Sequence, residues 1–127
     1  MNCVDSSVYI EYYMDGPNAA FFAPAIEELP KLIVPSICIY EVFKKISMEK
    51  SPASAKTFVA QMLDGIVITL DQEIAVFAAA LSINHKLPMA DAIIYATAQN
   101  HSATLWTQDN HFAGLPGVQF KAKSIAS

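Results

Sequence analysis

The chain has 127 residues and a formal net charge of −4, with 54% apolar and 16% charged residues. A sequence this apolar does not belong to the disordered class, and its length predicts one domain spanning residues 1–127. Its basic side chains are 8 lysines and no arginine. This composition excludes a strongly basic nucleic-acid-binding protein, but it does not exclude a nuclease. We expect a partner to cover part of the apolar surplus.

The cysteines and the apolar runs predict a cytoplasmic protein. Cys3 and Cys38 form no CxxC motif, and we expect both to be free thiols in a reducing compartment. No basic region leads into an apolar stretch at the N-terminus, so no export signal is expected. The longest apolar run, 74–83, is too short to cross a membrane, which needs about 20 residues. The three histidines show no HxxxH spacing, which argues against a zinc site.

Short apolar segments alternate with helical patterns along the chain. Strands are predicted over 2–4, 32–34, 66–70, 103–106 and 118–120. Their continuous apolar character predicts burial on both faces. Helices are predicted over 7–14, 17–28, 36–50, 52–63, 71–86 and 88–100, with Ser36, Ser51 and Asp71 as N-caps. This alternation predicts an α/β fold, a three-layer α/β/α sandwich with a parallel sheet of about five strands.

Four acidic side chains stand where such a fold places a functional site. Asp5 follows the first strand and Asp109 follows the fourth, so both are expected at the carboxyl edge of the sheet. If these two strands are neighbours, both carboxylates face one crevice. Asp91 lies in the first turn of its helix, where the helix dipole also favours an acid. Glu41 lies in mid-helix among apolar residues, where a carboxylate is costly unless a lysine or a metal pairs with it.

Four carboxylates in one crevice raise each other's pKa, and hard divalent cations relieve this repulsion. Removing four acids from the 12 in the chain leaves 8, which equals the number of lysines. The net charge of −4 is thus accounted for by the expected site, and two divalent ions would cancel it. Mg²⁺ or Mn²⁺ held by carboxylates suits phosphodiester hydrolysis. Whether one or two ions bind stays open.

Four motifs then occur in one order along the chain: V-D-S-S at 4–7, I-Y-E-V-F-K-K at 39–45, L-P-M-A-D-A-I-I-Y-A-T-A at 87–98 and T-Q-D-N-H-F at 107–112. In order and approximate spacing they closely resemble PIN-domain ribonucleases, and within these the VapC toxins of type II toxin–antitoxin modules. The resemblance covers essentially the whole chain. It implies a PIN-like fold and an Mg²⁺- or Mn²⁺-dependent endoribonuclease that acts on RNA. It also implies a homodimer and a VapB-like antitoxin that blocks the site.

The resemblance implies a catalytic acidic set of four residues, Asp5, Glu41, Asp91 and Asp109. Asp5 and Asp91 are implied as direct metal ligands, and the other two as ligands directly or through water. Ser6 and Thr107 match auxiliary hydrogen-bonding positions, although local backbone capping explains a hydroxyl there equally well. Many relatives carry a further acid at the place of His111, and its loss is expected to shift the metal preference or weaken a second metal site. We expect His111 to be a solvated loop residue, with contact to an RNA phosphate as the alternative.

Lysines must supply the contacts to RNA phosphates, because the chain has no arginine. Lys44 and Lys45 are the candidate RNA contacts, with pairing to Glu41 as the alternative, whereas Lys121 and Lys123 are expected to be a solvated chain end. The N-terminal helices also carry an aromatic surplus that predicts a groove for an amphipathic partner helix. The aromatic residues are Tyr9, Tyr12, Tyr13, Phe21 and Phe22, of which we expect most to lie in the core and the rest to line the groove.

Two related folds are disfavoured by missing motifs. A receiver-type signalling domain would carry an adjacent acidic pair near the first strand and a lysine after a late strand, and neither is present. A haloacid-dehalogenase-like phosphatase would carry D-x-D where this chain has D-S-S. A PIN fold that binds RNA or protein without cutting remains the alternative to the nuclease. Neither the RNA target nor the sequence of the antitoxin is predicted.

Overall fold

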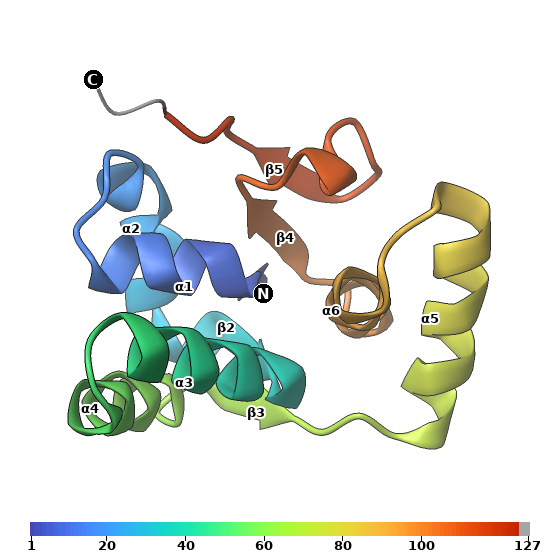
Figure 1. The fold of residues 1–127 in the computed structure, drawn as a ribbon. Helices are drawn as coiled ribbons and strands as arrows, with labels where there is room; N and C mark the ends of the chain where they lie inside the picture. The colour runs from blue at the N-terminus through green and yellow to red at the C-terminus, as the bar shows by residue number, and fades with distance from the viewer. Residues whose placement is uncertain (125–127) are drawn as a thin grey trace.

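A five-stranded parallel sheet with the order β3-β2-β1-β4-β5 organises the chain, and the computed structural model describes residues 1–124. Its strands are β1 (Asn2–Val4), β2 (Leu32–Pro35), β3 (Ile66–Ile68), β4 (Thr104–Thr107) and β5 (Val118–Phe120). The chain builds β1, β2 and β3 toward one edge and then crosses to β4 and β5 toward the other edge (Figure 1). The switch point of strand order therefore lies between β1 and β4, as expected.

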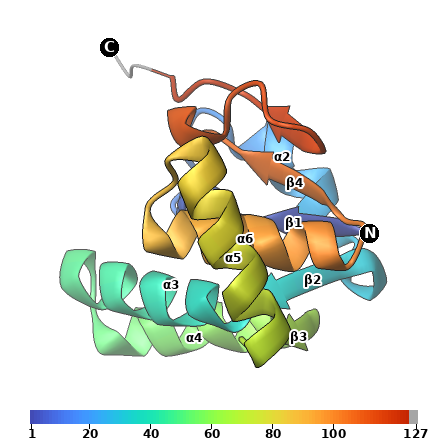
Figure 2. The ribbon, with the colours of Figure 1, turned by 90° about the vertical axis from the view of Figure 1, so that its right-hand side faces the viewer.

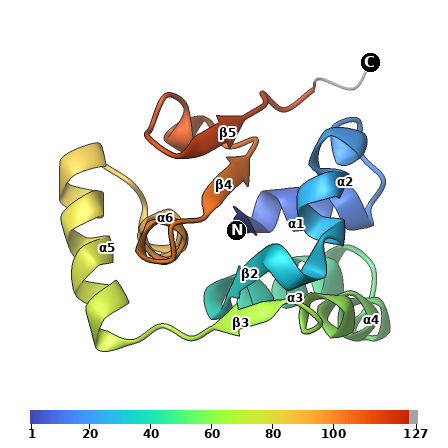
Figure 3. The same ribbon diagram turned by 180° about the vertical axis from the view of Figure 1, so that it is seen from behind.

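Six α-helices surround this sheet. They are α1 (Ser6–Tyr13), α2 (Ala19–Glu27), α3 (Ser36–Glu49), α4 (Pro52–Met62), α5 (Gln72–His85) and α6 (Met89–Asn100), with short 3-10 helices η1 (Leu29–Lys31) and η2 (Asn110–Phe112). Helices α5 and α6 lie on one side of the sheet, and α1 and α2 lie on the other (Figures 1 and 3). Helices α3 and α4 pack against each other beside the β2–β3 end, and α5 packs against α6 (Figure 2). This arrangement confirms the predicted α/β fold.

The core lies around the central strands and α6. Cys3 and Val4 of β1 and Val34 of β2 are fully buried. Helix α6 is buried without interruption from Ala92 to Ala98, because α5 covers the side that faces away from the sheet. A helix covered in this way needs apolar residues all round, and this explains the A-I-I-Y-A run of the sequence.

The edges of the sheet correct one expectation. Continuous apolar character predicted strands buried on both faces, but Ile66 and Val67 of β3 are exposed by 41% and 37%. Strand β5 is likewise only half-buried or exposed. Both are edge strands that the neighbouring helices cover incompletely, so the expectation holds for the inner strands β1 and β2 and is wrong for the two edges.

The helix starts follow their predicted caps with one exception. The Ser51 hydroxyl accepts a hydrogen bond from Ser54 N, and the Asp71 carboxylate accepts one from Ile74 N. The N-cap of α3 is Pro35, which makes no side-chain capping bond, and Ser36 is instead the first helical residue. The predicted cap at Ser36 is therefore wrong.

Two smaller expectations concern sulfur and membranes. Cys3 and Cys38 are both free and buried, and burial raises the pKa of each thiol. Among the helices of residues 1–124, none is both long enough and apolar enough to span a bilayer.

Candidate functional site

Asp5 is a buried carboxylate held at the switch point of the sheet. It directly follows β1, is only 3% exposed and is the N-cap of α1. Its Oδ1 accepts hydrogen bonds from Val8 N at 3.2 Å and from Ser7 Oγ at 2.8 Å, and its Oδ2 accepts one from Thr107 Oγ1 at 2.6 Å. Because each carboxylate oxygen has two lone pairs, Oδ2 keeps one acceptor position free.

Thr107 links Asp5 to a second carboxylate. Thr107 is the last residue of β4, next to β1 in the sheet, and its Oγ1 also accepts a hydrogen bond from Asp109 N at 3.0 Å. The Asp109 side chain caps η2 by accepting a bond from His111 N at 2.9 Å. One hydroxyl therefore contacts both strand-end acids: it donates to the Asp5 carboxylate, and it also makes the local backbone capping bond that was the alternative for Thr107.

His111 lies between two acids instead of standing free in solvent. Its Nδ1 is 2.9 Å from Asp91 Oδ2, in the first turn of α6, and 3.1 Å from Asp109 Oδ1. The expectation of a merely solvated loop residue is therefore wrong, although the side chain is 53% exposed. The pKa of His111 is raised above its ordinary value. The hydrogen bond to Asp91 is the largest cause, and the charge of Asp109 is the second.

Glu41 approaches the same region from α3. Ser6 Oγ, in the first turn of α1, donates a 2.6 Å hydrogen bond to Glu41 Oε1. Helices α1 and α3 lie beside each other, which brings these two side chains together (Figure 1). The alternative was a lysine paired with Glu41. In the structure Lys45 Nζ instead pairs with Glu49 Oε1 at 2.9 Å. Lys44 Nζ lies over the Tyr40 ring.

The charges of other acids contribute to the raised pKa values of two of the four, Asp5 and Asp91. Burial is the largest cause and raises the pKa of Asp5 to about 6. Three hydrogen bonds to the carboxylate lower the pKa, and the charge of Asp109 raises it. Burial also raises the pKa of Asp91, and the charges of Asp109 and then Glu41 raise it further. Mutual repulsion of this kind is what a bound cation would relieve.

One group of side chains within residues 1–124 has the geometry of a metal site. Asp91, Asp109 and His111 each offer one ligand atom, and these atoms all lie within 4.8 Å of one another. Asp5 and Glu41 are not members of this group. The donor set of carboxylates and one imidazole, together with the free acceptor position on Asp5, fits a divalent cation with mixed oxygen and nitrogen ligands.

Two pockets flank these acids and meet at Ser7. The first, of about 330 Å³, lies beside α3 and contains Ser6, Glu41 and both lysines that the sequence singled out, Lys44 and Lys45. The second, of about 400 Å³, is lined by Ser7, Gln108, Asp109, Asn110, His111 and Lys123. Because Ser7 lines both pockets, the two hollows adjoin, with Glu41 in the first and Asp109 in the second.

The C-terminal segment is exposed, as expected of a solvated end, but its backbone is tied to the rest of the fold. Lys121 N donates to Thr107 O at 3.0 Å, and Asn18 Nδ2 donates to Ala122 O at 3.0 Å. Lys121 Nζ lies 5.1 Å from the centre of the Phe21 ring. These contacts hold the segment beside the site and place Lys123 in the second pocket. Sequence reasoning missed Lys123 because no local pattern indicates that residues 121–124 lie near Thr107 and Asn18.

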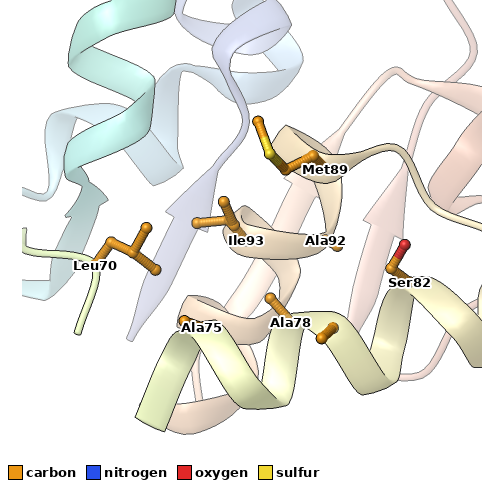
Figure 4. Close-up of a pocket in the computed structure, with 8 residues that line it drawn as sticks. Leu70, Ala75, Ala78, Ser82, Met89, Ala92 and Ile93 are labelled. Carbon is orange, nitrogen blue, oxygen red and sulfur yellow. The ribbon is translucent and has the colours of Figure 1, made fainter. Parts of the chain in front are cut away.

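A third, apolar pocket of about 330 Å³ lies between α5, α6 and the segment that precedes α5. Figure 4 shows Leu70, Met89 and Ile93 around it, with Ala75 and Ala78 of α5 opposite. No acidic side chain lines this pocket, so it is distinct from the acidic site.

The fold and site define a class of domain: a parallel α/β sheet with carboxylates at its switch point. The family model described as PIN domain matches residues 3–118, and the chain belongs to this family. Comparison with curated proteins finds no match.

The chain is also similar to several solved structures. A toxin–antitoxin complex from Klebsiella pneumoniae contains a chain with a TM-score of 0.77 and 28% identity, over 94% of this chain and 96% of that one. VapBC2 from Rickettsia felis, bound to a DNA fragment from its promoter, gives a TM-score of 0.73 and 14% identity over 95% and 97%. VapC20 from Mycobacterium tuberculosis, a toxin that cleaves the sarcin–ricin loop, gives 0.73 and 13% over 91% and 95%. The last two likenesses show the fold alone.

Proposed function

We propose that the chain is a metal-dependent endoribonuclease of the PIN family and the toxin of a type II toxin–antitoxin module. The observation that carries this proposal is the joining of Asp5 and Asp109 through Thr107 at the switch point. The charge of Asp109 also raises the pKa of Asp91, and so does the charge of Glu41. A fold that only scaffolds other molecules has no need to bury a carboxylate beside a second one whose charge raises its pKa, because this costs free energy of folding.

The four acids would hold one or two ions of Mg²⁺ or Mn²⁺. Such a cation, when bound, supplies Lewis-acid chemistry for phosphodiester hydrolysis by stabilising charge on the phosphate and making water more acidic. Asp91 and Asp109 offer outward-facing oxygens for the cation, and Asp5 offers its remaining lone pair. Ser6 orients Glu41, and Thr107 orients Asp5 and Asp109, so that these carboxylates do not rotate away.

The RNA strand would run through the two pockets that adjoin at Ser7. Lys44 lies in the pocket on the Glu41 side, and Lys123 lies in the pocket on the Asp109 side. A strand that crosses between them places a phosphodiester over the acids, with a lysine available to neighbouring phosphates on either side. Lysine contacts of this kind position the backbone of the RNA but do not select a base sequence.

Cleavage of a labelled RNA in the presence of Mg²⁺ or Mn²⁺ tests the nuclease directly. We expect cleavage that stops with a chelator and falls by at least about 100-fold in Asp5→Asn and in Asp91→Asn. Asp64→Asn, which changes an exposed acid remote from the site, is the matched control and should cut normally. Cleavage that survives in both site variants would overturn the proposal. RNA that is bound but never cut would favour the alternative, a non-cleaving binding module.

An antitoxin is the second part of the proposal, supported by the likeness to a chain of a toxin–antitoxin complex. Tyr12 and Tyr13 of α1 are only half-buried, and with Phe58 of α4 they line a hollow of about 470 Å³. Tyr13 stacks on Phe58 with ring centres 4.6 Å apart, which gives this hollow a rigid aromatic wall. An amphipathic helix of a VapB-like antitoxin fits such a groove. Tyr13→Glu should release a co-expressed antitoxin, whereas Tyr40→Glu on α3 should retain it.

A homodimer is the third part of the proposal, and we assign it to the outer face of α5. Val76 and Ile83 of this helix are 67% and 79% exposed, and Met89 beside them is 75% exposed. Met89 also lines the apolar pocket of Figure 4, so a second copy that covers this face would bury the pocket together with the exposed side chains of α5. Ile83→Lys should convert a dimer to a monomer in light scattering at equal concentration. A wild-type chain that is monomeric at all concentrations would contradict this assignment.

A further inference from the structure

The distances from His111 Nδ1 to two carboxylate oxygens match the distance between neighbouring ligands of one metal ion. The two carboxylates belong to different parts of the fold. His111 Nδ1 lies 2.9 Å from Asp91 Oδ2 and 3.1 Å from Asp109 Oδ1. Adjacent ligands of an octahedral ion with bonds of about 2.1 Å lie about 3.0 Å apart. The distance from the imidazole nitrogen to each oxygen is therefore already the distance expected between two ligands of one ion. All three atoms lie within 4.8 Å of one another.

The backbone fixes this imidazole at the site. His111 lies in η2, where its own N donates to Asp109 Oδ1 at 2.9 Å. The next residue, Phe112, is fully buried and packs edge-on against Tyr95 of α6, with ring centres 6.1 Å apart. Because Asp91 belongs to the same helix as Tyr95, the core contact of Phe112 anchors His111 next to Asp91.

We propose that His111 Nδ1 is a direct ligand of the divalent cation, together with Asp91 and Asp109. The inference deepens the proposed nuclease and rests on it, because it adds a nitrogen ligand to the acidic set. An imidazole ligand suits transition-metal ions better than Mg²⁺, which prefers oxygen. His111 therefore shifts the metal preference of the site toward Mn²⁺ and away from Mg²⁺.

Pulsed electron paramagnetic resonance of the Mn²⁺-loaded full chain tests the ligand without RNA and without activity. We expect a nitrogen-14 coupling to bound Mn²⁺ in the wild type, and its loss in both His111→Asp and His111→Gln. His101→Gln is the matched control, because the His101 Nδ1 faces Thr97 O at the opposite end of α6 from Asp91. The coupling should persist in that control. Thermal unfolding of each variant verifies that it is folded.

Calorimetric titration with Mg²⁺ and with Mn²⁺ gives a second readout. The ratio of the two dissociation constants, Mg²⁺ over Mn²⁺, should fall about fivefold in His111→Asp and should not change in His101→Gln. The ratio is the informative quantity because both ions bind the same metal-free protein. Any difference in how that protein arranges its side chains before binding therefore cancels.

The outcomes separate this inference from the nuclease itself. If the wild type binds Mn²⁺ and cuts RNA but shows no nitrogen coupling, and the ratio is the same in His111→Asp, then His111 is not a ligand and the nuclease stands. If the wild type binds neither ion and cuts no RNA, the proposed function falls and this inference falls with it.

Discussion

Thr107 Oγ1 lies 2.6 Å from Asp5 Oδ2, and this hydrogen bond joins the carboxyl ends of two strands whose residues are 102 positions apart in the chain. The strands are neighbours, with Val4 aligned to Trp106, so the residues that follow them are held side by side. The same hydroxyl accepts a hydrogen bond from Asp109 N. One small side chain thereby sets the relative position of two acids in the proposed active site.

Removing this hydroxyl should therefore disturb both stability and activity. Thr107→Val keeps the volume but leaves a buried acceptor on Asp5 and the Asp109 N–H without their partner, at a cost of about 1–3 kcal/mol. Urea unfolding at pH 7 measures this loss, and the rate of RNA cleavage should fall with it. Thr107→Ser retains the hydroxyl and should recover most of both quantities. A Thr107→Val protein that is as stable and as active as the wild type would contradict this role.

The buried charge of Asp5 should make the metal-free protein less stable above pH 6. Burial raises its pKa from 3.8 to about 6, so between these values the folded state binds more protons than the unfolded state. The unfolding free energy should therefore fall as pH rises from about 4 to 6, by up to about 3 kcal/mol.

Asp5→Asn tests this pH dependence. Without the ionisable group, the variant should be more stable than the metal-free wild type at pH 7 while lacking activity. Its unfolding free energy should change less between pH 4 and 6 than that of the wild type. Chemical denaturation in a chelator at both pH values provides the measurement. A variant that is less stable than the wild type at pH 7 would show that the hydrogen bonds of Asp5 outweigh the cost of burying its charge.

Divalent cations should stabilise the folded chain, because they offset repulsion among the four acids. At a concentration about 100 times the dissociation constant, binding adds about 2.7 kcal/mol to the unfolding free energy. The melting temperature should rise with Mn²⁺ and return to its starting value on adding a chelator. Asp91→Asn should lose most of this increase, and Asp64→Asn should keep it. An equal increase in all three proteins would point to binding elsewhere on the surface.

Affinity for RNA should depend on salt through Lys123 as well as Lys44. With a chelator present to prevent cleavage, Lys123→Gln should weaken binding of single-stranded RNA and reduce the slope of log affinity against log salt by about 0.7. Lys56→Gln on α4, which changes an exposed lysine outside both pockets, should leave the slope unchanged. If Lys123→Gln has the same slope as the wild type, the C-terminal segment does not contact the RNA backbone.

The element pattern was predictable because it depends on local residues. All five strands and six α-helices occur where the sequence predicted them, with ends that differ by two residues or fewer. Capping at Ser51 and Asp71 was equally local. The exception at Ser36 shows the limit of this reasoning, because Pro35 both ends β2 and fixes the backbone that enters α3. A serine in the following position then becomes helical without acting as a cap.

Contacts across the fold were not predictable in the same way. His111 was expected to be solvated, yet it contacts Asp91 because Phe112 packs against α6. Lys123 was expected to lie at a solvated end and is exposed, yet Asn18 and Thr107 also bind the backbone of its segment. Neither contact follows from the spacing of nearby residues.

The sequence by itself determined the α/β alternation and the family and predicted the four acids, because strand ends, helix turns and motif order depend on short segments of chain. The tertiary structure decided which oxygen of Asp5 remains free, that His111 joins the acids, and that Lys123 reaches the site. These depend on distances between segments that only packing brings together, and a distance set by packing has no local signature in the sequence.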